Sequence, residues 1–130
     1  MSVIKLIRQH GENGEHYDMS SFFEDFDRYF HVKRWQIQVD WCQGDGSSEI
    51  ERQSENGLSI MDTEFRELYR NIYQTIDGEF QAFDGERRVA RLLAIDSSYW
   101  EVESDNQAFI DEMAAKCGLY QSPLLDSRKD

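Results

Sequence analysis

Proline, cysteine and long apolar runs are all scarce in this chain of 130 residues. Its two cysteines, Cys42 and Cys117, are too few for a disulfide framework. No segment approaches the ~20 apolar residues of a membrane span, and the N-terminus lacks the basic and apolar pattern of a secretory signal. The single proline favours continuous elements over a linker-rich architecture. We therefore expect a cytoplasmic protein with no membrane association.

Basic residues are also few, with 14 against 26 acids, which gives a net charge of −12. A nucleic-acid binder needs the opposite sign, because its affinity comes largely from neutralising phosphates. Acidic proteins are suited to solubility and to fast association with basic partners. Eight Phe, six Tyr and three Trp supply enough apolar material for a core, unlike in disordered acidic chains. The composition predicts a folded protein with a basic protein partner.

Apolar residues at spacings of three and four predict three helices. The first carries Ser21 and Glu24 at the spacing of a capping box. The second begins near Asp62 and extends to Ile76, and the third covers 105–117. The apolar stripes of the first two helices are Met19, Phe22, Phe23, Phe26, Tyr29 and Phe30, then Phe65, Leu68, Tyr69, Ile72, Tyr73 and Ile76.

Alternation of apolar and polar residues predicts the strands. The clearest strand is 34–42, in which Trp35, Ile37, Val39 and Trp41 share one face. Shorter runs at 3–8, 79–83, 87–95 and 99–103 are separated by turn residues, and the last three form an expected antiparallel meander. Residues 43–59 are polar and predict a surface loop, with room for a short strand at 48–53.

The predicted order of elements is β-α-β-loop-α-β-β-β-α, which belongs to the α+β class. We expect helices to pack on one face of a largely antiparallel sheet. Residues 1–118 then form a single domain, and 119–130 form a C-terminal tail that packs briefly through Tyr120 and Leu124.

Motifs of known chemistry are missing. The histidines and cysteines show no zinc-ligand spacing, and we find neither a serine-hydrolase elbow, a P-loop nor a dinucleotide-binding glycine pattern. We expect no metal, no cofactor and no enzymatic activity. One chemical option stays open: Glu101 and Glu103 share a strand face, with Asp96 and Asp105 at its ends. Such carboxylates either serve a hydrolase, with or without magnesium, or form a solvated face.

The negative charge is concentrated in two windows. Residues 35–65 hold seven acids and only Arg52 as a base, and 96–112 hold six acids and no base. Clustered charge of one sign is costly, and a cationic partner relieves that cost. If the two windows lie near one another, they form one acidic surface with aromatic side chains. The predicted partner-binding residues are Asp40, Trp41, Asp45, Glu49, Glu51, Asp96, Glu101, Glu103 and Asp105.

In length, acidity, single-domain organisation and lack of an enzyme motif, the chain resembles the small immunity proteins that bacteria make against polymorphic toxins. The segments LYRNIYQTIDG (68–78) and IDSSYWEV (95–102) have a family-like appearance, although the resemblance covers composition and architecture and not individual sites. It implies a non-enzymatic inhibitor that covers the basic groove of a toxin with its acids. The alternatives are a small regulatory or scaffold protein that binds another partner, and the carboxylate-dependent hydrolase.

Overall fold

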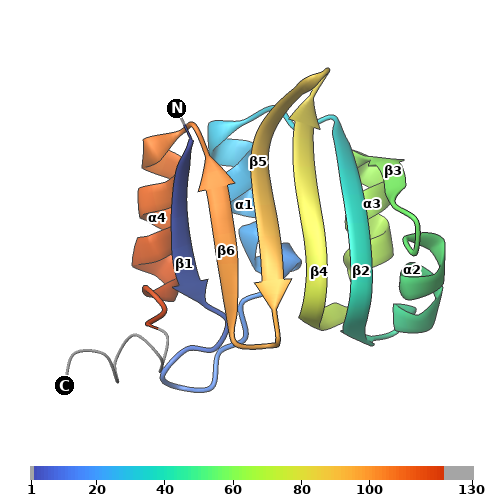
Figure 1. Ribbon diagram of the computed structural model, residues 1–130, viewed down its shortest axis with the longest axis horizontal. Coiled ribbons are helices and arrows are strands. Elements are labelled where there is room, and N and C mark those ends of the chain that lie inside the picture. Colours follow the sequence, from blue (N-terminus) through green and yellow to red (C-terminus); the bar gives the residue numbers. More distant parts are fainter. Residues whose placement is uncertain (1, 122–130) are drawn as a thin grey trace.

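A six-stranded antiparallel sheet forms one layer of the protein, and helices cover one of its faces (Figure 1). This arrangement confirms the predicted α+β class. The computed structural model describes residues 2–121. Its elements are β1 (Val3–Arg8), α1 (Met19–Tyr29), β2 (Arg34–Gly44), α2 (Ser47–Gln53), β3 (Leu58–Met61), α3 (Asp62–Tyr69), β4 (Ile72–Asp84), β5 (Arg87–Ile95), β6 (Tyr99–Ser104) and α4 (Gln107–Cys117).

The strands lie in the order β1-β6-β5-β4-β2-β3, and every neighbouring pair is antiparallel. The run from β4 through β5 to β6 is the predicted meander. Four of the predicted binding residues lie on strands, namely Asp40 and Trp41 on β2 and Glu101 and Glu103 on β6. Strands β5 and β4 lie between β6 and β2. At roughly 4.8 Å per strand step, their axes lie about 14 Å apart.

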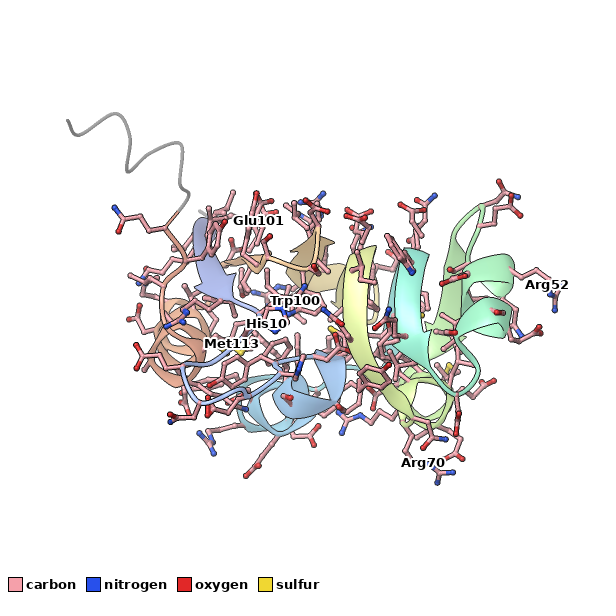
Figure 2. The ribbon with its side chains drawn as sticks, turned by 90° about the horizontal axis from the view of Figure 1, so that it is seen from below. His10, Arg52, Arg70, Trp100, Glu101 and Met113 are labelled. Atoms are coloured by element: carbon pink, nitrogen blue, oxygen red, sulfur yellow. The ribbon has the colours of Figure 1, made fainter. Side chains whose placement is uncertain are left out.

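The two faces of the sheet differ sharply in polarity. Figure 2 shows Trp100 directed toward the helical layer and the next residue, Glu101, directed away from it. The helix-facing side chains include Trp35, Phe80 and Trp100, all fully buried. Burial of each large apolar side chain contributes about 1.5–3 kcal/mol. The opposite face of the sheet, which we call the open face, carries no helix (Figure 1).

The prediction of one helix from Asp62 to Ile76 is wrong in its second half. Helix α3 ends at Tyr69, and the chain then enters the long strand β4. The apolar residues at 72, 73 and 76 keep helical spacing, but they are β-branched or aromatic types that also suit a strand. Within β4, Ile72 pairs with Gly44 of β2; Ile72 and Ile76 are buried and Tyr73 is exposed, so tertiary contacts override the local pattern.

The region 43–59, predicted as a loop with room for a strand at 48–53, instead contains helix α2 and strand β3. Glu, Arg and Gln favour the helix, and Ile50 anchors it in the core. The capping box of the first helix differs from the predicted pair Ser21 and Glu24. Asp18 is the N-cap of α1, and the Ser21 hydroxyl accepts a hydrogen bond from the Asp18 amide at 3.3 Å.

The start of the predicted tail packs along the outer edge of β1. The Arg8 amide donates to Gly118 and the Tyr120 amide donates to Leu6, each at 2.9 Å. The Tyr120 ring stacks on Tyr99 with centroids 4.5 Å apart, in line with the packing expected of Tyr120. The predicted contact of Leu124 lies outside the described residues.

Candidate protein-binding surface

Trp41 is exposed because of an irregularity in β2. Val39 pairs with Gly78 and Trp41 with Asp77, so Asp40 is an extra residue in the strand, which is a β-bulge. The bulge shifts the alternation by one position, and Cys42 takes the buried place predicted for Trp41. The indole is 54% exposed, which corrects the expectation that Trp41 belongs to the core face.

Helix α2 brings further predicted acids next to this bulge. The Glu51 carboxylate accepts a hydrogen bond from the Cys42 amide at 3.0 Å, which ties the helix to β2. Glu49 forms an ion pair with Arg52 in the same helix. Asp45 lies exposed in the turn between β2 and α2. We call the group Asp40, Trp41, Asp45, Glu49 and Glu51 the acidic end; in Figure 1 it lies at the α2 side of the molecule.

Asp40 also lines a shallow hollow of about 280 Å³ on the open face. Asp77 and Glu79 from β4 and Arg91 from β5 line the same hollow. These three residues were missed in the sequence. Their signal was the alternation of β4 and β5, which places residues 77, 79 and 91 on the open face once the strands are correctly assigned.

Glu101 and Glu103 lie elsewhere on the open face, where Arg91 contacts both of them. The Arg91 guanidinium lies 3.5 Å from Glu101 and 3.9 Å from Glu103, and its Nε lies 2.5 Å from Glu79. Arg88 adds a second contact to Glu103 at 3.6 Å. These ion pairs offset the negative charge of β6, although Arg88 and Arg91 lie outside the acidic window in the sequence.

The remaining acids of the second window are dispersed. Asp96 has a left-handed backbone conformation (φ 51°) in the β5–β6 turn, and Asp105 accepts a hydrogen bond from Ser2 at 3.1 Å. On α4, Asp111 pairs with Lys5, and Glu112 contacts Arg28 and Tyr29. The structure therefore brings together the acids of residues 40–51 but does not join Asp96, Glu101, Glu103 and Asp105 to them.

Acids in the first window have fewer basic neighbours. Within residues 2–121, no ion pair forms at Asp40, Asp45, Glu51, Glu55 or Glu64. In the second window, four of six acids pair with an Arg or Lys. Among the described residues, the first window therefore holds more acids without an ion pair than the second.

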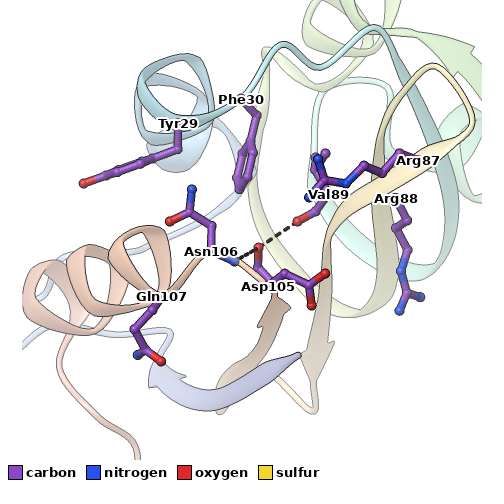
Figure 3. Close-up of a pocket in the computed structure, with 9 residues that line it drawn as sticks. Tyr29, Phe30, Arg87, Arg88, Val89, Asp105, Asn106 and Gln107 are labelled. Carbon is purple, nitrogen blue, oxygen red and sulfur yellow. Dashed lines mark hydrogen bonds between the residues drawn. The ribbon is translucent and has the colours of Figure 1, made fainter. Parts of the chain in front are cut away.

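A second hollow, of about 450 Å³, has a different chemical character (Figure 3). It is lined by Tyr29, Arg87, Arg88 and Asp105, and by Asn106 and Gln107 at the start of α4. Ser104 also lines the hollow: its hydroxyl donates to the Val89 carbonyl at 2.7 Å and accepts from the Asn106 amide at 3.1 Å. Dashed lines mark these two hydrogen bonds in Figure 3. None of its acids is shared with the acidic end.

Neither cysteine has the environment of a nucleophile. Burial, with Glu51 as a secondary cause, raises the pKa of Cys42 to about 12, and burial raises the pKa of Cys117 to about 12 as well. Among residues 2–121, we find no group of three or more His, Cys, Asp or Glu side chains placed to hold a metal ion.

A cluster of buried polar groups surrounds Thr75 of β4, and the sequence analysis did not predict it. Asp18 accepts from the Thr75 amide at 2.8 Å, and Thr75 Oγ1 lies 2.6 Å from the Tyr69 hydroxyl. Gln9 donates to the Thr75 carbonyl at 2.9 Å. Burial raises the pKa of Asp18 to about 6, against the hydrogen bonds from Thr75 and Met19 that lower it. The cluster joins the N-cap of α1, the last residue of α3 and the first part of β4.

Comparison of the chain with protein-family models, with curated proteins and with solved structures finds no match. None of the helices between residues 2 and 121 has the length and apolar character needed to cross a membrane.

Proposed function

We propose that this protein is a non-enzymatic inhibitor of the immunity type, which binds a basic protein partner through the acidic end. The observation that carries the proposal is the exposed Trp41 on a bulge beside Asp40, next to the acids of the β2–α2 turn and α2. The partner would be a cytoplasmic toxin domain with a basic groove.

Electrostatics supports the acidic end over the other acidic window. Asp40, Asp45 and Glu51 have no basic partner among the described residues, and Arg52 offsets only Glu49. On β6, by contrast, Arg88 and Arg91 already supply the positive charge that a partner would bring. A cationic protein therefore gains more Coulomb energy at the acidic end.

Trp41 supplies the apolar contact area that the charged side chains of the acidic end do not. Tight interfaces depend on a few aromatic or arginine anchors that become desolvated, and exposed acids mainly set the rate of encounter. An indole that is 54% exposed still has a large apolar surface to bury. The bulge at Asp40 presents this indole in place of a core contact, and bulges are common beside functional sites.

The contacts of Glu101 and Glu103 argue for binding over hydrolysis. Paired catalytic carboxylates need different environments, so that one is protonated and the other charged. Arg91 contacts both side chains, so the two carboxylates share one ionic partner and do not have different environments. The hydrolase alternative therefore has less support than the inhibitor.

Affinity capture from the cells that encode the protein, followed by mass spectrometry, tests the proposal. We expect wild-type protein and Glu86→Lys to retain one basic partner, and Trp41→Ala/Asp45→Lys to lose it. Glu86 is an exposed acid in the β4–β5 turn and serves as the matched control. Equal capture by all three proteins would contradict the proposed surface. Expression of the partner alone should be toxic, and co-expression with this protein should relieve the toxicity.

A further inference from the structure

The segment between β1 and α1 forms a short hairpin that places two histidines opposite each other. His10 and His16 form an isolated antiparallel bridge. Two backbone hydrogen bonds of 2.8 Å flank this bridge, one from the Gly11 amide to the Glu15 carbonyl and one from the Tyr17 amide to the Gln9 carbonyl. A pair flanked in this way is of the non-hydrogen-bonded type, in which the facing side chains lie closest together. The two imidazoles therefore share one side of the hairpin.

The separation of the two rings matches that of imidazoles on one metal ion. The ring centroids of His10 and His16 are 4.8 Å apart, at an interplanar angle of 81°. An ion about 2.0–2.1 Å from one nitrogen of each ring would lie about 3.2 Å from each centroid. The centroids would then be about 4.5 Å apart at a right angle and about 5.2 Å apart at a tetrahedral angle. His16 is exposed, so its ring has room to turn a nitrogen toward the ion.

A backbone carbonyl fixes which nitrogen of His10 carries the proton. The Nε2 atom of His10 lies 2.8 Å from the Ser97 carbonyl oxygen. Because a carbonyl can only accept, Nε2 donates this hydrogen bond, and the Nδ1 atom of the neutral ring keeps its lone pair. Histidines that bind metals commonly donate their other ring N–H to a backbone carbonyl in this way. His10 thus has the tautomer and the orienting contact of a metal ligand.

The Ser97 carbonyl is itself held in place by the turn between β5 and β6. Asp96 and Ser97 both have left-handed backbone conformations, with φ of 51° and 54°. The Ser98 amide closes the turn with a hydrogen bond of 2.9 Å to the Ile95 carbonyl. Positive φ at both central residues is the mark of a type I′ turn, which matches the twist of the strands that it joins. The orientation of the His10 ring therefore depends on the backbone of a closed turn and not on a mobile side chain.

We propose that His10 and His16 bind a divalent transition metal ion of the zinc, nickel and copper class. Imidazole nitrogen suits these ions, whereas magnesium and calcium prefer oxygen ligands. Two imidazoles are fewer than the three protein ligands of a catalytic zinc site, so water would complete the coordination. Glu15, in the loop of the same hairpin, makes no ion pair within residues 2–121, and its charge further favours a cation. From sequence we expected no metal, because the spacing of the two histidines matches no zinc motif and only the hairpin pairs them.

Calorimetric titration of the full chain, without an affinity tag, with nickel chloride tests the site. We expect one nickel ion to bind per chain. The variant His16→Ala should weaken binding by about tenfold or more, because the remaining imidazole no longer acts as part of a chelate. His31→Ala is the matched control, since His31 is exposed but lies outside the hairpin, and it should bind nickel like wild type. Equal affinity of the two variants, or no binding at millimolar nickel, would overturn the site.

NMR spectroscopy locates the bound ion and shows whether both imidazoles hold it. Nickel is paramagnetic, so at substoichiometric nickel the ring signals of His10 and His16 should broaden before those of His31. Magnesium at the same concentration should leave all three unchanged. Broadening of His16 without His10, or of His31 first, would contradict the proposed pair. The acidic end takes no part in this site, so Trp41→Ala/Asp45→Lys should bind nickel like wild type, and failure of the partner test would leave this result intact.

Discussion

The Asp18 carboxylate accepts a hydrogen bond from the Thr75 amide at 2.8 Å, which joins the start of α1 to the first part of β4. Only 3% of Asp18 is exposed. Burial disfavours its charged form, and the pKa rises from 3.8 to about 6. The residue that caps the first helix is therefore also a titrating group of the core.

This raised pKa predicts a specific pH dependence of stability. The folded protein binds the Asp18 proton more tightly than the unfolded chain does, so the contribution of Asp18 is greatest below pH ~4 and is lost as pH rises through about 6. The loss amounts to about 3 kcal/mol at most. We expect the free energy of unfolding of wild type, minus that of Asp18→Asn, to decrease between pH 4 and 7 in urea titrations. A difference that does not change with pH would contradict the assigned environment.

Ile37 tests the orientation of β2. It is 1% exposed on the helix-facing side, and Ile37→Asp should cost more than about 3 kcal/mol because it buries an unpaired charge. The control is Gln36→Asp, since Gln36 is exposed on the open face, and it should change stability by less than about 1 kcal/mol. Chemical denaturation followed by circular dichroism measures both. Equal stability of the two variants would mean that the strand faces are misassigned.

Ile37 also shows which parts of the fold were accessible from sequence. Strict alternation in 34–39 identified the strand and its buried face, because period two has no helical equivalent. The spacing of 65–76 could not place the end of α3, since Ile72 and Ile76 suit either element and only pairing with β2 decides. Trp41 was grouped with the core because a bulge does not change composition, although it changes which side chain is exposed.

The pairing of charged side chains was harder to predict than the fold, because it depends on which strands are neighbours in the sheet. Arg91 lies outside both acidic windows, yet β5 pairs with β6 so that Arg91 is opposite Glu103. Counting charges along the chain therefore overstated the negative potential of β6. The acids of 40–51 lie in β2, the following turn and α2, which are adjacent along the chain, so a window in the sequence can group them.

Glu101 and Glu103 allow a direct test of the hydrolase alternative. Magnesium or manganese at millimolar concentration should not shift the melting temperature, because the Arg91 guanidinium already contacts both carboxylates. The double variant Glu101→Gln/Glu103→Gln should behave like wild type in the same titration. A metal-dependent rise of several degrees that disappears in the double variant would support the enzyme over the inhibitor.

Trp41 should act mainly on the lifetime of the complex. Trp41→Ala removes the proposed anchor, and we expect dissociation from the captured partner to accelerate by about tenfold or more, with a smaller change in association. Ile4→Ala is the control, because Ile4 is equally exposed, at 54%, on the distant strand β1. Surface plasmon resonance measures both rates. Similar dissociation rates for the two variants would show that Trp41 does not contribute to the interface.

The acids of the acidic end should act mainly on the rate of encounter. Attraction between opposite charges is screened over roughly 8–10 Å at physiological salt, so association should slow steeply as salt is added. Reversal of Asp40 or Asp45 should have a larger effect than reversal of Glu101 or Glu103, whose charge Arg88 and Arg91 partly offset. Reversal of Glu12 or Glu86, which lie outside both windows, should have little effect.

The most direct test of this account is the stopped-flow association rate of Asp45→Lys against the identified partner, measured beside Glu86→Lys at low and at high salt. Both residues are exposed acids in turns, and each substitution changes the net charge equally. We predict that Asp45→Lys slows association about three- to tenfold at low salt, that Glu86→Lys does not, and that the difference disappears at high salt. Indistinguishable rates for the two variants at low salt would contradict the acidic end as the binding surface.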